Sequence, residues 1–145
     1  MRRMSFVVLA LIALAGACSG NEVSGDRRTV GGVGVAFSVA PSRAEIGRPV
    51  RFTLRLTNVT GKTERLTFPT GQRYDFWVMD GDEEVWRWSD DRVFTQAVTN
   101  ASIDTQATLV LTENWTPDRS GDFRAFGELA ADGYERPLSG EIHVG

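Results

Sequence analysis

The chain has 145 residues, of which 41% are hydrophobic, and it carries 16 basic and 19 acidic residues for a formal net charge of −3. This length suits one domain with a sizeable core, and the absence of a dense basic block or stripe argues against nucleic acid as a partner. The chain holds one histidine and one cysteine, too few for a zinc site or for a Ser–His–Asp or Cys–His mechanism, so we expect no catalytic residues, no metal and no cofactor.

The first 17 residues have the features of an export signal. Two arginines near the start supply positive charge, an apolar run follows from Phe6 to Leu14, and residues 15–17 are small. The run is shorter than the roughly 20 residues that a membrane-spanning helix needs, and this pattern is typical of a cleaved signal peptide. Cys18 follows directly, so residues 14–18 (LAGAC) resemble a bacterial lipoprotein lipobox. We expect lipid on Cys18 that anchors the protein in the cell membrane or the outer membrane, with its domain outside the cytoplasm.

Residues 18–30 follow the signal peptide and contain two glycines and four charged residues. They carry no apolar period, and such a composition is typical of a flexible tether. We therefore expect residues 18–30 to link the lipid to a single domain that spans residues 31–145.

From residue 31 onward, apolar residues alternate with polar ones, which is the period of a half-buried strand. The run Val50–Thr57 shows this best, because its valine, phenylalanine and leucines alternate with arginines and threonines. Turn signals recur about every ten residues, and no segment has a sustained helical stripe. The expected strands are Val33–Val39, Val50–Thr57, Glu64–Phe68, Tyr74–Met79, Glu84–Trp88, Val93–Gln96, Ala107–Leu111, Phe123–Leu129 and Leu138–Val144. The sequence thus predicts an all-β fold, an immunoglobulin-like antiparallel β-sandwich.

Aromatic residues concentrate between Tyr74 and Gln96, where two expected strands form a hairpin. A turn centred on Gly81 and Asp82 would place Trp77 opposite Trp86, whereas a turn centred on Asp80 and Gly81 would place Trp77 opposite Glu84. We favour the first turn because it pairs like side chains across the strands. Trp77, Trp86 and Trp88 would then share one face of the hairpin, which is either covered by loops or exposed as a contact surface.

Residues 71–96 (GQRYDFWVMDGDEEVWRWSDDRVFTQ) resemble the BsuPI-type intracellular proteinase inhibitor family. The matching elements are Gly71-Gln72, Tyr74-Asp75-Phe76, Val78, Asp80-Gly81, Val85-Trp86-Arg87-Trp88-Ser89 and Phe94-Thr95-Gln96. The resemblance implies a small β-sandwich that binds a serine proteinase, and it assigns no reactive-site residue to this chain.

We therefore expect a non-enzymatic protein whose partner is a serine proteinase or another envelope protein. The polar loop 87–92, which leaves the aromatic hairpin, is the first candidate contact. The candidate binding residues are Trp77, Trp86, Arg87, Trp88, Ser89, Asp90, Asp91 and Arg92. An alternative is an envelope structural or assembly module that binds polysaccharide through the three tryptophans of the hairpin. His143, the only histidine, is expected to be a solvent-facing strand residue.

Overall fold

Eleven β-strands build the part of the chain that the computed structural model describes, residues 22–145. The strands are β1 (Ser24–Val30), β2 (Val33–Ala40), β3 (Arg43–Ala44), β4 (Val50–Asn58), β5 (Glu64–Phe68), β6 (Tyr74–Asp80), β7 (Glu83–Arg87), β8 (Thr99–Ile103), β9 (Thr108–Trp115), β10 (Gly121–Leu129) and β11 (Leu138–Val144). The expected signal peptide and the lipid-bearing Cys18 lie outside the described residues. Within residues 22–145, no helix is long and apolar enough to cross a membrane.

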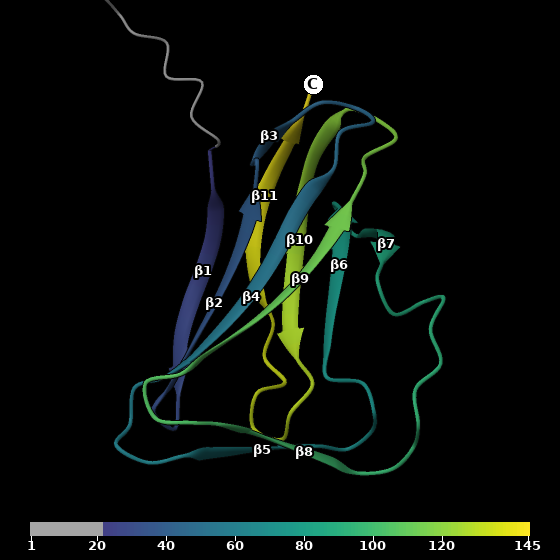
Figure 1. The fold of residues 1–145 in the computed structure, drawn as a ribbon. Helices are drawn as coiled ribbons and strands as arrows, with labels where there is room; N and C mark the ends of the chain where they lie inside the picture. The colour runs from purple at the N-terminus through teal and green to yellow at the C-terminus, as the bar shows by residue number, and fades with distance from the viewer. Residues whose placement is uncertain (1–21) are drawn as a thin grey trace, which may run out of the picture.

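The strands form two facing sheets and a small third one (Figure 1). One sheet has the order β1-β2-β4-β9 and the other the order β3-β11-β10-β6-β7, while β5 and β8 pair at one end of the sandwich. Every pairing is antiparallel except the short parallel contact between β3 and β11. The predicted fold class, an immunoglobulin-like antiparallel β-sandwich, is confirmed.

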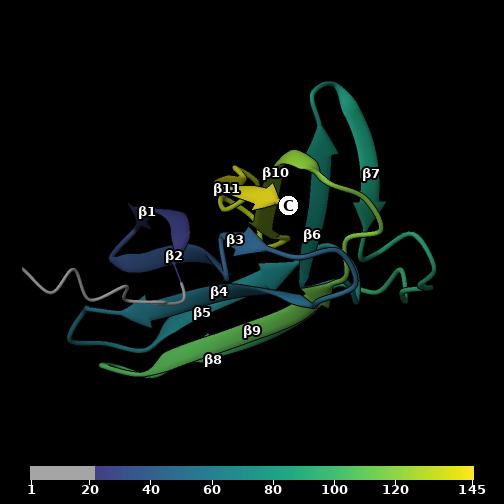
Figure 2. The same cartoon turned by 90° about the horizontal axis from the view of Figure 1, so that it is seen from above.

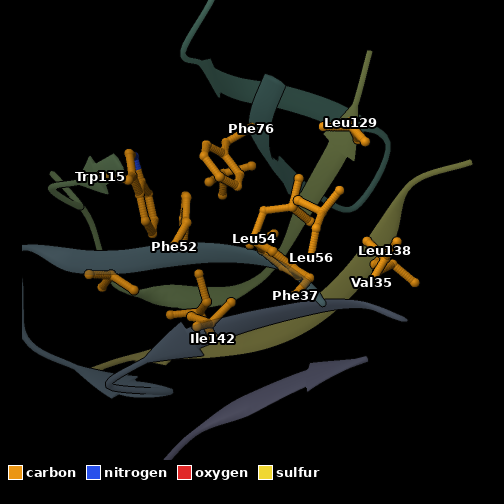
Figure 3. Close-up of a cluster of buried hydrophobic side chains, with 14 of the residues drawn as sticks. Val35, Phe37, Phe52, Leu54, Leu56, Phe76, Trp115, Leu129, Leu138 and Ile142 are labelled. Atoms are coloured by element: carbon orange, nitrogen blue, oxygen red, sulfur yellow. The ribbon is translucent and has the colours of Figure 1, made fainter. Parts of the chain in front are cut away.

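The core lies between the two sheets and follows from the period-two pattern of the sequence (Figure 3). Alternate residues of β2 and β4 are buried, and they face the buried residues of β6, β10 and β11. Phe37, Phe52 and Phe76 come from three different strands, and their ring centroids lie 6.0 to 6.1 Å apart. Burial of each such ring contributes roughly 1.5–3 kcal/mol, so this aromatic cluster ties the two sheets together.

The expected flexible tether is wrong from Ser24 onward, because these residues form strand β1. The strand pairs with β2 from Ser24 opposite Val39 to Val30 opposite Val33, and Ser24 Oγ accepts a 2.8 Å hydrogen bond from the backbone N–H of Glu141. An edge strand can be polar, because its backbone bonds come from the neighbouring strand and charged side chains protect a free edge. The domain therefore begins earlier than composition indicated.

Two other expectations about strands need correction. Residues 93–96 do not form a strand but run as an irregular segment of the loop between β7 and β8. The unpredicted strand β8 pairs with β5, with Phe68 opposite Thr99 and Glu64 opposite Ile103. Polar residues dominate β8, so the sequence lacks the alternation that would have marked it.

The β6–β7 hairpin has the predicted turn and the predicted pairing of Met79 with Glu84, but not the predicted pairing from Val78 onward. Asp80 pairs with Glu83 around a two-residue turn, and Gly81 takes the positive φ of 57° that such a turn requires. A β-bulge then shifts the register, so that Trp77 lies opposite Arg87 instead of Trp86. An extra residue in one strand reverses the direction of the side chains that follow it, which decides where the tryptophans point.

Candidate functional site

The three hairpin tryptophans do not share a face. Trp86 packs toward the core with its ring 5.8 Å from that of Phe52, and Trp88 stacks on Tyr74 at 4.4 Å. Trp77 lies on the opposite side of the sheet, where its ring is 5.3 Å from Phe126 and nearly parallel to it. The bulge thus separates Trp77 from the other two, and the expected platform of three tryptophans is not formed.

A charged network fixes the end of β7 beside Trp77. The Arg87 guanidinium lies 4.5 Å above the Trp77 ring, donates a 2.7 Å hydrogen bond to Asp75 Oδ2 and a 2.8 Å bond to Glu84 Oε1. Asp75 Oδ2 also accepts a 2.7 Å bond from Ser89 Oγ. Burial alone would lower the pKa of Arg87, but the bonds to Glu84 and Asp75 outweigh it and raise the pKa.

Asp75 and Glu84 belong to this network, and sequence analysis did not single out either of them as a site residue. Asp75 is the more buried of the two. It is only 8% exposed, and Asp75 and Asn58 are the two buried polar residues of the range 22–145. A buried carboxylate is retained only where hydrogen bonds and an opposite charge satisfy it. Asp75 therefore acts as the anchor from which the loop after β7 departs.

The loop after β7 is fixed where it begins. Trp88 donates a 2.9 Å backbone hydrogen bond to Phe76, and Arg92 donates a 3.1 Å backbone bond to Ser89. The Arg92 side chain folds back over the Trp88 ring at 4.3 Å and donates to the Trp88 carbonyl. The side chains of Asp90 and Asp91 are exposed here.

The same loop is fixed again where it ends. Gly71 donates a 2.8 Å backbone hydrogen bond to Thr95, and the Thr99 hydroxyl donates to the Thr70 carbonyl at 3.2 Å. A Cβ on Gly71 would lie 2.6 Å from Thr95 Oγ1 and 3.3 Å from the Thr95 backbone nitrogen, so any other residue at position 71 would force Thr95 to shift. We call residues 88–96 the braced loop.

The braced loop runs along one edge of the sandwich, beside a hollow. Figure 2 shows that the hairpin of β6 and β7 projects at one edge of the five-stranded sheet, and the loop continues from the edge strand β7. A hollow of about 310 Å³ separates the start of the loop from β9. Its lining includes Trp86, Trp88, Asp91, Arg92, Glu113 and Asn114. Residues 90–93 are exposed, so a partner can reach this part of the loop.

Tyr74 supports the base of the braced loop and has a displaced pKa. Its hydroxyl donates a 2.7 Å hydrogen bond to Glu113 Oε1, and its ring stacks against the Trp88 ring. Burial, followed by the negative Glu113 carboxylate, raises the pKa of Tyr74 to about 12. The folded state therefore stabilises the neutral phenol over the phenolate.

We expect the free energy of unfolding to fall as the pH rises from about 10 to about 12. In this window the unfolded tyrosine has lost its proton while Tyr74 in the folded state keeps it. Burial also raises the pKa of Tyr134, the only other tyrosine, so a near-ultraviolet titration of the folded protein should show both phenolate transitions above the ordinary range. Tyr74→Phe should remove the transition near pH 12. Ionisation of Tyr74 at the ordinary tyrosine pKa of about 10 would contradict this assignment.

His143 is exposed on β11, as expected, with Nδ1 2.6 Å from Asp122 Oδ1. This pair lies on a different strand pair from the braced loop, at the outer face of β10 and β11. Within residues 22–145, no three His, Cys, Asp or Glu side chains come together as a metal site would require. The hairpin and the loop offer a fixed backbone, exposed side chains and aromatic support.

The fold and the loop together define an immunoglobulin-like β-sandwich that displays a loop held at both ends. The family model described as BsuPI, intracellular proteinase inhibitor, matches residues 37–134, a range that includes the hairpin and the whole braced loop. The chain belongs to this family. No curated protein matches the chain.

Several solved structures are similar in architecture. A CARDB domain from Pyrococcus furiosus, described in complex with di-metal ions, is 15% identical with a TM-score of 0.42, and the match covers 84% of this chain and 90% of that one. A β-glucosidase from Listeria innocua in complex with glucose is 10% identical with a TM-score of 0.43, over 86% of this chain and 16% of the enzyme. The alkylpurine DNA glycosylase AlkC from Pseudomonas fluorescens, bound to DNA, is 10% identical with a TM-score of 0.43, over 74% of this chain and 28% of the glycosylase.

Proposed function

We propose that this protein is a non-enzymatic, membrane-anchored lipoprotein whose domain binds and inhibits a serine proteinase. The braced loop is the observation that carries this proposal, because it is an exposed segment whose two ends are fixed on a domain of a proteinase-inhibitor family. A loop that is ordered before binding loses little conformational entropy when it enters an enzyme's cleft. Arg87 and Ser89 hold the start of the loop through Asp75, and Asp90 to Arg92 are the accessible part of the original candidate set.

The polysaccharide alternative loses its main support from the same geometry. A sugar platform needs several aromatic faces on one surface, and the bulge directs Trp86 and Trp88 toward the core. Trp77 remains on the outer side, but the Phe126 ring stacks on it and the Arg87 guanidinium lies over its ring. We therefore propose protein recognition through the loop.

The anchoring part of the proposal rests on Cys18 and the export signal before it. Acylation of this cysteine would hold the domain at the outer surface of the cell membrane or at the outer membrane, where the partner would be a proteinase of the envelope. Cells fed with labelled palmitate should place the label on this protein, and Cys18→Ala should abolish the labelling. Equal labelling of the two forms would contradict lipid attachment at Cys18.

Inhibition is tested with the purified full-length protein in detergent against a panel of serine proteinases. We expect saturable inhibition of at least one enzyme. We expect Trp88→Ala to weaken this inhibition, because the loop then loses its support on Tyr74. Asn114→Ala serves as the matched control, since Asn114 lies beside the loop but on the neighbouring strand β9. If no enzyme is slowed at micromolar protein, the inhibitor function is wrong.

A further inference from the structure

We propose that Val93 is the side chain that fills the primary specificity pocket of the target proteinase, and that this pocket is therefore small and apolar. The proposal rests on the inhibitor function proposed above and assigns a substrate-like residue to it. Val93 follows directly after the candidate residues 87–92 and was not among them. It is 100% exposed, which makes it the most exposed large hydrophobic residue in the range 22–145.

The neighbours of Val93 turn inward while Val93 turns outward. Before it, the Arg92 side chain lies on the Trp88 ring at 4.3 Å and donates a 3.2 Å hydrogen bond to the Trp88 carbonyl. After it, the Phe94 ring packs 5.9 Å from the same indole and is only partly exposed. Trp88 thus holds both flanking side chains against the scaffold, and Val93 stands between them with no intramolecular support.

The backbone around Val93 is held at short range on both sides. The Arg92 N–H bonds to Ser89, one residue before Val93, and the Thr95 carbonyl accepts from Gly71, two residues after it. Residues 92–96 have no regular secondary structure, so they have no strand partner to lose when an enzyme binds them. A side chain presented on such a backbone can enter a pocket at little entropic cost.

The chemistry of Val93 selects the class of enzyme. Primary pockets of serine proteinases are acidic in trypsin, a deep hydrophobic slot in chymotrypsin and small in elastase. Arg92 and Phe94 would suit the first two pockets, but both side chains are engaged with Trp88. A branched valine fills a small apolar pocket and leaves a deep slot partly empty, so the loop fits an elastase-like enzyme.

The test measures inhibition constants of elastase, chymotrypsin and trypsin with the full-length protein and its variants. We expect the unaltered protein to inhibit elastase best. Val93→Arg should weaken that inhibition by a factor on the order of 100 or more, because an unpaired charge would enter an apolar pocket. The same variant should gain inhibition of trypsin, and Val93→Phe should gain inhibition of chymotrypsin.

Val59→Arg is the matched control, because Val59 is also an exposed valine, at 64%, and it lies in the turn after β4, outside the braced loop. This variant should inhibit elastase as the unaltered protein does, and thermal unfolding should show that all variants are folded. Elastase inhibition that is unchanged by Val93→Arg would overturn the assignment of Val93 while the inhibitor function stands. Preferential inhibition of trypsin or chymotrypsin by the unaltered protein would also overturn it. Inhibition of no enzyme at all would instead remove the inhibitor function together with this inference.

Discussion

Replacement of Asn58 by alanine is expected to lower the free energy of unfolding by about 3 kcal/mol, since each buried polar group left unpaired costs about 1–3 kcal/mol. Asn58 is completely buried at the end of β4. Its Nδ2 donates to the carbonyls of Lys62 at 2.8 Å and Ile103 at 2.9 Å, and its Oδ1 accepts from the backbone N–H and the hydroxyl of Thr60. One side chain therefore joins the turn after β4 to the end of β8.

Urea unfolding followed by tryptophan fluorescence measures this loss. The midpoint should fall with little change in the denaturant dependence, because alanine removes hydrogen bonds without altering the area that unfolding exposes. Asn58→Asp should be at least as damaging, since a carboxylate would face two carbonyls that now receive N–H groups. Asn114→Ala, at an exposed position on β9, is the control and should change stability by less than about 0.5 kcal/mol. A loss below about 1 kcal/mol for Asn58→Ala would show that water replaces these bonds.

Gly127→Ala is the second large effect, with an expected loss of about 2 kcal/mol from overpacking. Gly127 is buried in the second half of β10, where a Cβ would lie 2.6 Å from Phe37 Cδ2 and 3.1 Å from Phe76 Cε1. Both rings belong to the central aromatic cluster and stack on each other at 6.0 Å. Neither ring can retreat without disturbing Phe52, so the added methyl group strains the contact between the sheets.

The same denaturant titration tests Gly127→Ala, with Gly34→Ala as its matched control. Gly34 also lies within a strand, β2, but a Cβ there would meet only the Thr57 carbonyl at an ordinary 3.7 Å. Alanine at position 34 should be neutral or slightly stabilising, because it reduces the freedom of the unfolded chain. If the two variants lose the same stability, close packing of Phe37 against β10 is not the cause.

Sequence periodicity predicted the strands that bury one face. β5 and β11 have the predicted bounds, and β2 and β4 differ from them by a residue at their ends. In each of these strands, buried apolar side chains recur at every second position. The burial that stabilises the strand can therefore be predicted from the residues of the strand itself. The strands β1 and β8 were missed because partner strands, rather than their own side chains, hold them in place.

The hairpin register was predicted correctly at the turn but not beyond the β-bulge. Pairing of like residues across two strands favoured Trp77 opposite Trp86, and the turn itself was placed correctly. The bulge nevertheless forms, and it lets Trp86 reach Phe52 on β4 and Trp77 reach Phe126 on β10. Contacts with strands distant in sequence thus outweigh local pairing, and a hairpin considered alone could not include them.

The candidate site proposed from the sequence stays a prediction. The loop 87–92 was chosen for its polarity, and it does begin the braced loop. The roles of Asp75 and Val93 could not be predicted, because one depends on burial beside Arg87 and the other on two neighbours that fold back on Trp88. Only the spatial arrangement separates the residues that support the loop from the one that the loop presents.

Strand β1 sets how far the domain could stand from a membrane. If Cys18 carries the lipid as proposed, only six residue steps separate it from Ser24, the first residue of the sheet. A fully extended chain of that length reaches about 20 Å, comparable with the radius of the domain itself. β1 and β7 lie at opposite lateral edges of the sandwich (Figures 1 and 2). The segment that links Cys18 to β1 would therefore join the domain on the side away from the braced loop. The tether would then keep the domain close to the bilayer. The domain could bind proteinases that act at the membrane surface, and it could not reach those that act farther away.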